Sequence, residues 1–279
     1  MEGFHLWLLP LGFLIGAYGT LIGAGGGFVL MPMLILLYPG QNPEILTSVS
    51  LAVTFFNALS GSAAYARLKR IDYKSGLMFA AATIPGAVIG ALHTSSVHRR
   101  DFDLIFGIVL VIVSVYLFWQ PSIGKKARQR KPGRFALTRT MTSVGGDTFT
   151  YTFNPAIGIV LSVAVGYLSS FLGIGGGIIH VPMMSRLLGF PVHVATATSH
   201  FVLAIMTLAG TLVHVVMGNF HHSYKRVIML AAGVLIGAQL GAVLSNRIKG
   251  HWIIRGLAIA LGFVGIRILI LAIELGKTG

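Results

Sequence analysis

The stretch Leu21–Met33, LIGAGGGFVLMPM, places three consecutive glycines, Gly25 to Gly27, in an apolar run. No Asp, Glu, Lys or Arg occurs in the 35 residues from Phe4 to Tyr38. As one continuous helix this run would be roughly 50 Å long, whereas the hydrocarbon core of a bilayer is about 30 Å thick. Each glycine in a helix costs about 1 kcal/mol relative to alanine. We therefore predict a helix, a glycine turn and a short second helix that contains Pro32.

The same pattern returns 150 residues later at Phe171–Met183, FLGIGGGIIHVPM. Two further segments keep nearly the same spacing: TSVSL at 47–51 matches TATSH at 196–200, and GAVIGA at 86–91 matches GAQLGA at 237–242. Because three matches keep both order and distance, the sequence predicts an internal duplication. Repeats of this kind are common in secondary transporters, which bind substrate at the repeat interface.

The composition indicates a membrane protein. The chain is 55% hydrophobic and only 10% charged, whereas a soluble domain has about a quarter of its residues charged. Apolar blocks near the roughly 20 residues of a membrane-crossing helix lie at 5–38, 44–66, 75–93, 102–119, 154–188, 194–218, 226–245 and 252–273. We predict an all-α polytopic membrane protein of two homologous repeats. Each has about four transmembrane segments, the first of them broken at the Gly-Gly-Gly motif.

Three parts follow from this pattern: a first transmembrane repeat at 1–119, a basic cytoplasmic linker at 120–153 and a second repeat at 154–279. The linker is assigned to the cytoplasm because Lys and Arg collect in cytoplasmic loops. The same preference explains the net charge of +14 without nucleic acid as a partner. No basic region precedes the first apolar run, so no cleaved signal peptide is expected. The basic residues of the linker are Lys125, Lys126, Arg128, Arg130, Lys131, Arg134 and Arg139.

The sequence does not decide whether the two repeats have the same or opposite orientation in the membrane. Four crossings per half would make the two repeats parallel, with residues 225–226 on the cytoplasmic side. If each broken segment crosses twice, there are five crossings per half and the repeats are inverted. Residues 225–226 then lie outside, while the linker remains inside in both arrangements.

The glycine motifs predict an anion-binding site. Irregular backbone is tolerated at membrane depth only where protein buries it or a polar cavity receives its N–H and C=O groups. A helix that begins after such a turn presents free N–H groups and the positive end of its dipole. The alternative is that the glycines only allow close helix packing. We expect substrate contacts from Gly25, Gly26, Gly27, Gly175, Gly176 and Gly177.

The helix after each motif carries a polar stripe at spacings of three, four and seven residues. A single Ser or Thr often bonds only its own backbone, but a whole stripe is better explained by a polar cavity. The histidines could also couple transport to protons. The stripes are Thr47, Ser50, Thr54, Asn57, Gly61 and Tyr65 in the first half, and Thr196, His200, Leu203, Thr207, Thr211 and His214 in the second.

Several chemistries are excluded or disfavoured by residues that the chain lacks. With no cysteine, thiol catalysis and thiolate metal sites are excluded, and no GxxxxGK[ST] motif occurs for ATP. No cofactor and no metal are expected. Cation pumps commonly use buried carboxylates, yet all acidic residues lie in predicted loops or near span ends, which favours an anionic or neutral substrate. These acids are Glu2, Glu44, Asp72, Asp101, Asp103, Asp147 and Glu274.

A glycine break ahead of a proline, a following Thr/Ser helix start and then GAxxGA, all occurring twice, resemble the TauE/SafE family of sulfite and organosulfonate exporters. The resemblance covers most of the chain except the linker. It implies export of sulfite, sulfoacetate or taurine-related sulfonates. The matching residues are Gly23, Gly25, Gly26, Gly27, Pro32, Thr47, Ser48, Gly173, Gly175, Gly176, Gly177, Pro182, Thr196 and Ala197.

Together these observations predict a secondary transporter, an exporter, of a small sulfur-containing anion, working by alternating access. A passive anion channel is the alternative. An intramembrane enzyme is disfavoured, and a scaffold role in which the basic linker recruits a partner stays open. The expected location is the cytoplasmic (inner) membrane, with lipid, the anion and, as one option, a second copy in a homodimer as partners. Besides the glycines, the expected substrate contacts are Thr47, Ser48, Ser50, Asn57, Thr196, Thr198, Ser199 and His200, with His200 and His214 as candidates for proton coupling.

Overall fold

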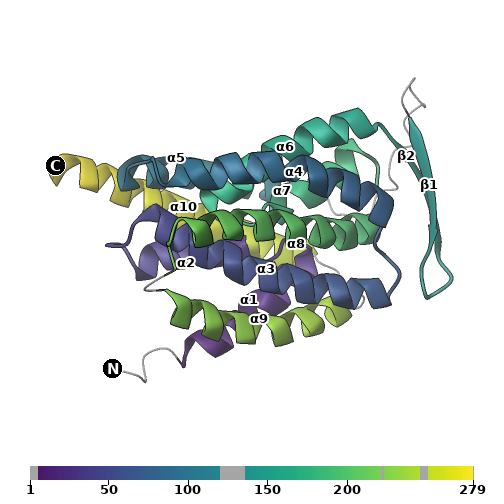
Figure 1. The fold of residues 1–279 in the computed structure, drawn as a ribbon, viewed down its shortest axis with the longest axis horizontal. Coiled ribbons are helices and arrows are strands. Elements are labelled where there is room, and N and C mark those ends of the chain that lie inside the picture. Colours follow the sequence, from purple (N-terminus) through teal and green to yellow (C-terminus); the bar gives the residue numbers. More distant parts are fainter. Residues whose placement is uncertain (1–5, 120–135, 221–222, 246–250, 279) are drawn as a thin grey trace.

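The computed structural model describes residues 6–119, 136–220, 223–245 and 251–278, with 251–257 and 275–278 described by backbone alone. The first half contains α1 (Leu8–Ile22), α2 (Gly27–Leu37), α3 (Pro43–Arg67), α4 (Tyr73–Thr94) and α5 (Arg99–Phe118). Two strands follow, β1 (Leu137–Thr142) and β2 (Thr148–Phe153). The second half contains α6 (Pro155–Leu172), α7 (Gly177–Pro182), the π-helical turn η2 (Met183–Leu187), α8 (Val192–Val216), α9 (Tyr224–Leu244) and α10 (His251–Thr278) (Figure 1).

Within the described residues, six helices are long and apolar enough to cross a membrane, namely α3, α4, α5, α6, α8 and α9. Large apolar side chains are exposed on the outside of the bundle, among them Leu77, Ile112, Val160, Ile236 and Phe263. Exposed apolar surface of this extent is expected of a protein that faces lipid. The architecture confirms the prediction of an all-α polytopic membrane protein.

Both glycine motifs interrupt a helix. α1 ends at Ile22, α2 begins at Gly27, and between them Gly25 and Gly26 have φ angles of 76° and 78°. In the second half, Gly175 and Gly176 have φ angles of 76° and 63°. This left-handed conformation is strained for any residue with a side chain, so the turn requires glycine at these positions.

Corresponding helices of the two halves run in opposite directions. On the central pair, Gly61 late in α3 lies against His200 early in α8, and Gly210 late in α8 lies against Leu51 early in α3. On the outer pair, Ser114 of α5 donates a hydrogen bond to the carbonyl of Ala258 in α10, at 2.6 Å. Gly107, earlier in α5, lies against Leu269, later in α10. The two halves are therefore inverted, which decides between the alternatives that the sequence left open.

The first helix of each half packs along the fourth helix of the other half. Gly12 and Gly16 of α1 lie against Leu230 and Val234 of α9, so these two helices are parallel. The end of α2 lies at the same end of the bundle as the start of α1. Arg226 near the start of α9 stacks on Tyr38, which follows α2, at 4.0 Å from the ring centroid, and α9 starts at the end where α1 starts. In the described residues each half thus has four helical segments when the broken segment counts as one, as predicted, and five when its two arms are counted separately.

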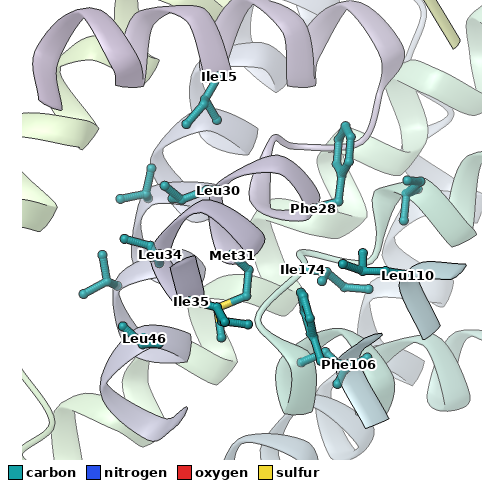
Figure 2. Packing of buried hydrophobic residues seen from close by; sticks show 14 of the residues in the cluster. Ile15, Phe28, Leu30, Met31, Leu34, Ile35, Leu46, Phe106, Leu110 and Ile174 are labelled. Atoms are coloured by element: carbon teal, nitrogen blue, oxygen red, sulfur yellow. The ribbon is translucent and has the colours of Figure 1, made fainter. Parts of the chain in front are cut away.

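The centre of the bundle is formed by α3, α8 and the two breaks. The most apolar part of α3 is 78% buried, against 39–50% for the other five candidate spans. Phe28 and Met31 of α2 lie close to Ile174 and to Phe106 and Leu110 of α5 in one core cluster (Figure 2). Both breaks are consequently shielded by apolar side chains from two halves of the chain.

The linker contains a two-stranded antiparallel hairpin, a β element that the sequence analysis did not anticipate. One face carries Thr–Thr pairs across the strands, such as Thr138 with Thr152. On the other face, the rings of Tyr151 and Phe153 lie 4.4 and 4.9 Å from the ring of Phe190, between η2 and α8. The hairpin caps one end of the bundle, and α1 begins and α10 ends at the opposite end (Figure 1). Of the basic linker residues, Arg139 lies in β1 and Lys125, Lys126, Arg128, Arg130, Lys131 and Arg134 lie outside the described residues.

Candidate functional site

The two helix breaks touch each other inside the protein. A β-carbon placed on Gly177 would lie 2.6 Å from the Cα of Ala24, and one placed on Gly27 would lie 2.8 Å from the carbonyl of Ile174. Residues 23–28 and 171–178 are all buried. Both halves therefore contribute to one buried central region where the glycine motifs meet, and this region is the candidate site.

Two backbone amides at the start of α2 have no acceptor among the residues that the structure describes. The amides of Val29 and Leu30 donate to the carbonyl of Gly26, but in the described part of the chain no hydrogen bond is found for the amides of Gly27 or Phe28. Unpaired amides are expected in the first turn of a helix, where they carry the positive end of the helix dipole. At this depth they are buried, so a hydrogen-bond acceptor, and an anion above all, would stabilise them.

Thr54 of α3 lies between the two breaks. It is fully buried, and its hydroxyl has no hydrogen-bond partner among the described residues. A β-carbon on Gly27 would lie 2.6 Å from Thr54 Oγ1, and one on Gly175 would lie 2.5 Å from Thr54 Cγ2. The sequence placed Thr54 on the polar stripe but did not select it as a substrate contact.

Three more buried hydroxyls near the breaks lack a partner in the described residues, Thr47, Ser169 and Ser170, and so does the hydroxyl of Ser199 in α8. Ser169 lies beside the second break, where a β-carbon on Gly176 would come within 2.9 Å of its Oγ. Thr47 lies against Gly173. Most buried hydroxyls in proteins are hydrogen-bonded, so a group of unpaired ones beside free amides favours a polar ligand or water.

Two of the predicted substrate contacts, Asn57 and Ser50, use their side-chain donors to bind backbone carbonyls of the glycine turns. Asn57 donates from Nδ2 to the carbonyl of Gly25 at 2.7 Å and accepts from the Thr20 hydroxyl at 2.8 Å. Ser50 donates to the carbonyl of Gly173 at 2.5 Å. Because carbonyls in an irregular turn have no helical donor, these side chains stabilise the two turns.

Three other predicted contacts, Ser48, Thr198 and Thr196, do not direct a free hydroxyl at the amides of α2 in this structure. Ser48 donates to the carbonyl of Ile45 in its own helix, at 2.8 Å. Thr198 accepts from the amide of Asp72 near the hairpin, at 3.0 Å. Thr196 presents its methyl group to Gly23, since a β-carbon there would lie 2.5 Å from Thr196 Cγ2.

The two histidines proposed for proton coupling are separate. His200 is fully buried, and its ring meets that of Tyr65 edge-on with centroids 5.5 Å apart. His214 is also buried, but its Nδ1 pairs with Asn219 at 2.9 Å. Fourteen residues of helix separate them, roughly 21 Å along α8. Only His200 lies beside the elements that form the breaks.

The buried acidic side chains are held elsewhere. Asp72 accepts from Ser75 Oγ at 2.5 Å and from the Tyr151 hydroxyl at 2.8 Å, at the hairpin end. Asp103 pairs with Arg99 Nε at 2.7 Å near the start of α5. Among the described residues, no three His, Asp or Glu side chains are grouped as metal ligands. The central donors are thus free of a fixed negative charge nearby.

Sequence reasoning missed the serines at the end of α6. Ser169 and Ser170 immediately precede the second glycine motif, and Thr20 holds the place of Ser170 in the first half. Thr20 is part of the Asn57 network, and Ser170 lies against Gly210, where a β-carbon would come within 2.9 Å of its Oγ. The signal that could have identified them is a small polar residue one turn before each break.

The fold and the site define a polytopic membrane protein whose inverted halves enclose a donor-rich centre. The sequence profile described as "Sulfite exporter TauE/SafE" matches residues 8–268. The chain therefore belongs to the TauE/SafE family and is a membrane transporter of that type.

Similar proteins carry transporter names. The chain is 32% identical over 268 residues to "Probable membrane transporter protein YunE" of Bacillus subtilis (strain 168), covering 94% of this chain and 96% of that protein. It is 28% identical to "Probable membrane transporter protein YjnA" of the same organism, over 86% and 91% of the two chains. A probable membrane transporter protein of Methanocaldococcus jannaschii is 24% identical over 97% and 98%. No solved structure matches the chain.

Proposed function

We propose that the protein is a secondary transporter that exports a small sulfur-containing anion, such as sulfite or an organosulfonate, across the cytoplasmic membrane. The observation that carries this proposal is the position of the Thr54 hydroxyl, unpaired among the described residues and buried beside the free amides of Gly27 and Phe28. A sulfonate or sulfite oxygen accepts hydrogen bonds from both kinds of donor. The family to which the chain belongs supports the choice of sulfur as the central atom.

The charge distribution favours an anion over a cation. Asp72 and Asp103, the acidic residues that are buried in the described part of the chain, both have donors of their own away from the breaks. A cation at the centre would meet amide N–H groups and the positive end of α2, which repel it. An anion there needs no counter-charge from a side chain, because the helix start and the hydroxyls supply the donors.

The inverted arrangement of the two halves is compatible with a mechanism of alternating access. The site is buried in this structure, so it must open toward one side of the membrane at a time. Movement of one half against the other would open it, as in transporters with inverted repeats. The buried, closed centre favours this mechanism over the alternative of a passive channel.

Proton coupling through His200 or His214 is part of the proposal. His200 lies near the first break, because it contacts Gly61 and Tyr65, and the Tyr65 hydroxyl donates to the carbonyl of Thr20 at 2.9 Å. Replacing His200 with Gln keeps its size and removes its titration. If both His200→Gln and His214→Gln leave pH-driven transport intact, the coupling is wrong.

The proposal is tested with purified protein in two assays. Thermal stabilisation is measured with sulfite, sulfate, thiosulfate, taurine and sulfoacetate, and flux is measured in proteoliposomes with the stabilising anion. We expect stabilisation by at least one sulfur anion and saturable exchange of that anion across the membrane. Large unitary currents would instead indicate a channel, and stabilisation by cations alone would overturn the proposal. Light scattering of the same sample distinguishes a monomer from the homodimer that we expect as one option.

A further inference from the structure

The starts of two corresponding helices join the halves of the chain at the two ends of the bundle. α4 corresponds to α9 at an offset of 151 residues, which pairs Ser75 with Arg226, each in the first turn of its helix. The start of α9 contacts the loop after the first broken segment directly. The start of α4 contacts the loop after the second broken segment through the hairpin. Equivalent positions thus hold equivalent loops, one at each end.

The contact at the end where α1 begins is polar and carries charge. Arg226 donates to Gln41 Oε1 at 2.7 Å, and its guanidinium lies 4.0 Å from the centroid of the Tyr38 ring. Arg99, at the start of α5, donates to the carbonyl of Gln41 and pairs with Asp103 at 2.7 Å. In the described part of the chain no carboxylate pairs with Arg226, so its link to the other half depends on neutral groups. We call Tyr38, Gln41, Arg99 and Arg226 the arginine cluster.

The contact at the hairpin end is buried and largely aromatic. Asp72 caps α4 and accepts from the Tyr151 hydroxyl at 2.8 Å, and the ring of Tyr151 lies 4.4 Å from that of Phe190. Phe190 corresponds to Gly40, in the loop of the arginine cluster, at an offset of 150 residues. The amide of Asp72 also donates to Thr198 Oγ1 of α8 at 3.0 Å. We call Asp72, Tyr151 and Phe190 the hairpin cluster.

We propose that these two clusters are the gates of the transporter. The buried centre opens toward the end where α1 begins when the arginine cluster separates, and toward the hairpin end when the hairpin cluster separates. This inference rests on the alternating access of the proposed function and assigns the residues that control it. Neither cluster contains the amides of Gly27 and Phe28 or the Thr54 hydroxyl. The strength of each cluster therefore sets the access from its own end and leaves the central donors unchanged.

Access to the centre can be measured from each side with a single cysteine. The chain has no cysteine of its own, and Ser169, buried beside the second break, can be replaced with Cys at nearly the same size. The rate of its modification by a small membrane-impermeant methanethiosulfonate reagent is measured in intact cells and in inside-out vesicles. The hairpin end is expected in the cytoplasm, because basic residues concentrate there. Intact cells then report on the end of the arginine cluster.

Loss of either cluster should accelerate modification from one side only. Arg226→Met keeps the aliphatic stem but removes the charged donor, and should make modification in intact cells roughly tenfold to a hundredfold faster. Tyr151→Phe removes the bond to Asp72 and should have an effect of that size in inside-out vesicles instead. Lys225→Met and Thr140→Val are the matched controls, because these side chains are exposed beside the clusters. Both should leave the two rates unchanged.

Strengthening the arginine cluster should have the opposite effect. Gln41→Glu places a carboxylate where the amide oxygen now accepts from Arg226, and hydrogen bonds between charged partners are the stronger ones. Modification in intact cells should become severalfold slower, with the rate in inside-out vesicles unchanged or higher. A slower rate cannot result from misfolding, which would expose the cysteine. This variant therefore separates a gate from a residue that only stabilises the fold.

The outcomes separate this inference from the function on which it rests. Arg226→Met and Tyr151→Phe that accelerate modification equally from both sides, or from neither side, overturn the gates. A cysteine at 169 that stays unmodified in every variant also overturns them. If wild type carries sulfite or an organosulfonate in proteoliposomes while the gates fail, the proposed function stands. If the modification rates change side by side as expected and no such anion is carried, the gates stand and the proposed function is overturned.

Discussion

Gly177 packs directly on Ala24, so the backbones of the two helix breaks are in contact: a β-carbon on Gly177 would lie 2.6 Å from Ala24 Cα and 2.8 Å from Gly23 O. These atoms belong to different halves of the chain and cannot retreat as a flexible side chain would. The contact joins the two halves at the place where α2 and α7 begin. Any movement of one half relative to the other must therefore change this contact.

Gly177→Ala is expected to disturb this contact. The new methyl group meets backbone, and forced overpacking in a core costs typically about 1–3 kcal/mol. We expect a lower melting temperature in detergent and loss of most transport in proteoliposomes. Gly40→Ala is the matched control, since nothing lies within 4 Å of a β-carbon at Gly40. A Gly177→Ala protein with wild-type melting and flux would contradict the close contact.

Ser50 and Ser199 hold corresponding positions and should respond differently to the same change. Ser50 donates to the carbonyl of Gly173, whereas the Ser199 hydroxyl has no partner among the described residues. Ser50→Ala leaves a buried carbonyl unsatisfied and should cost about 1–3 kcal/mol of stability. Ser199→Ala should leave the stability of the empty protein nearly unchanged. Melting of both variants without ligand checks this, and equal destabilisation by the two would count against it.

Tyr151 anchors the hairpin to the bundle through Asp72. Tyr151→Phe removes a hydrogen bond to a buried carboxylate at 2.8 Å and should lower stability by roughly 1.5–3 kcal/mol. Trypsin cleavage at Arg139, followed by mass spectrometry, reports whether the hairpin has loosened. Thr140→Val, on the exposed face, is a control that should behave as wild type. If Tyr151→Phe melts and is cleaved like wild type, the hydrogen bond to Asp72 does not anchor the hairpin to the bundle.

The stability that Tyr151 contributes through its hydrogen bond to Asp72 should depend on pH. Burial raises the pKa of Tyr151 above its ordinary value of about 10, and the adjacent Asp72 carboxylate raises it further. A raised pKa means that the folded state favours the neutral phenol. The contribution to stability is therefore complete below pH 10 and declines as the pH rises through the folded value. The melting difference between wild type and Tyr151→Phe should be constant from pH 7 to 9 and should shrink above pH 10. A difference that shrinks already below pH 9 would be inconsistent with the raised pKa.

The inverted arrangement predicts the sides on which two loops lie. Basic residues concentrate at the hairpin end, including Arg67 at the end of α3 and Lys69 and Arg70 after it, which should place this end in the cytoplasm. Tyr224 begins α9 at the opposite end. Because the chain has no cysteine, single substitutions give a clean background. In intact cells, a membrane-impermeant maleimide should label Tyr224→Cys and not Thr140→Cys. Protection of both would support parallel repeats.

The broken segments, the membrane fold and the repeated pattern could be predicted because each depends on local composition. A glycine triplet in an apolar run predicts a break in the helix, and a chain with 55% hydrophobic residues is expected to lie in a membrane. The direction of the repeats could not be predicted from charge alone, since each alternative placed some basic residues inside. It depends on long-range packing, such as Gly61 against His200, which periodicity does not reveal.

The candidate site was predicted in part. The central position of the breaks followed from the motifs, but the stripe could not distinguish Thr54, whose hydroxyl has no partner among the described residues, from Ser50, which donates to the carbonyl of Gly173. That difference depends on which backbone groups the packed structure places beside each hydroxyl, and these come from distant parts of the sequence. The hairpin was overlooked although Thr alternates at 138, 140 and 142 and again at 148, 150 and 152 around a Gly-Gly-Asp turn, a pattern typical of two paired strands.

The most direct measurement of the central claim is an experimental structure of the purified protein with ethanesulfonate or sulfite bound. The account predicts density for the anion between the two breaks, with its oxygens within hydrogen-bonding distance of the Gly27 and Phe28 amides and of the Thr54 hydroxyl. An anion bound elsewhere, with both breaks still closed on each other and these donors unpaired, would contradict it.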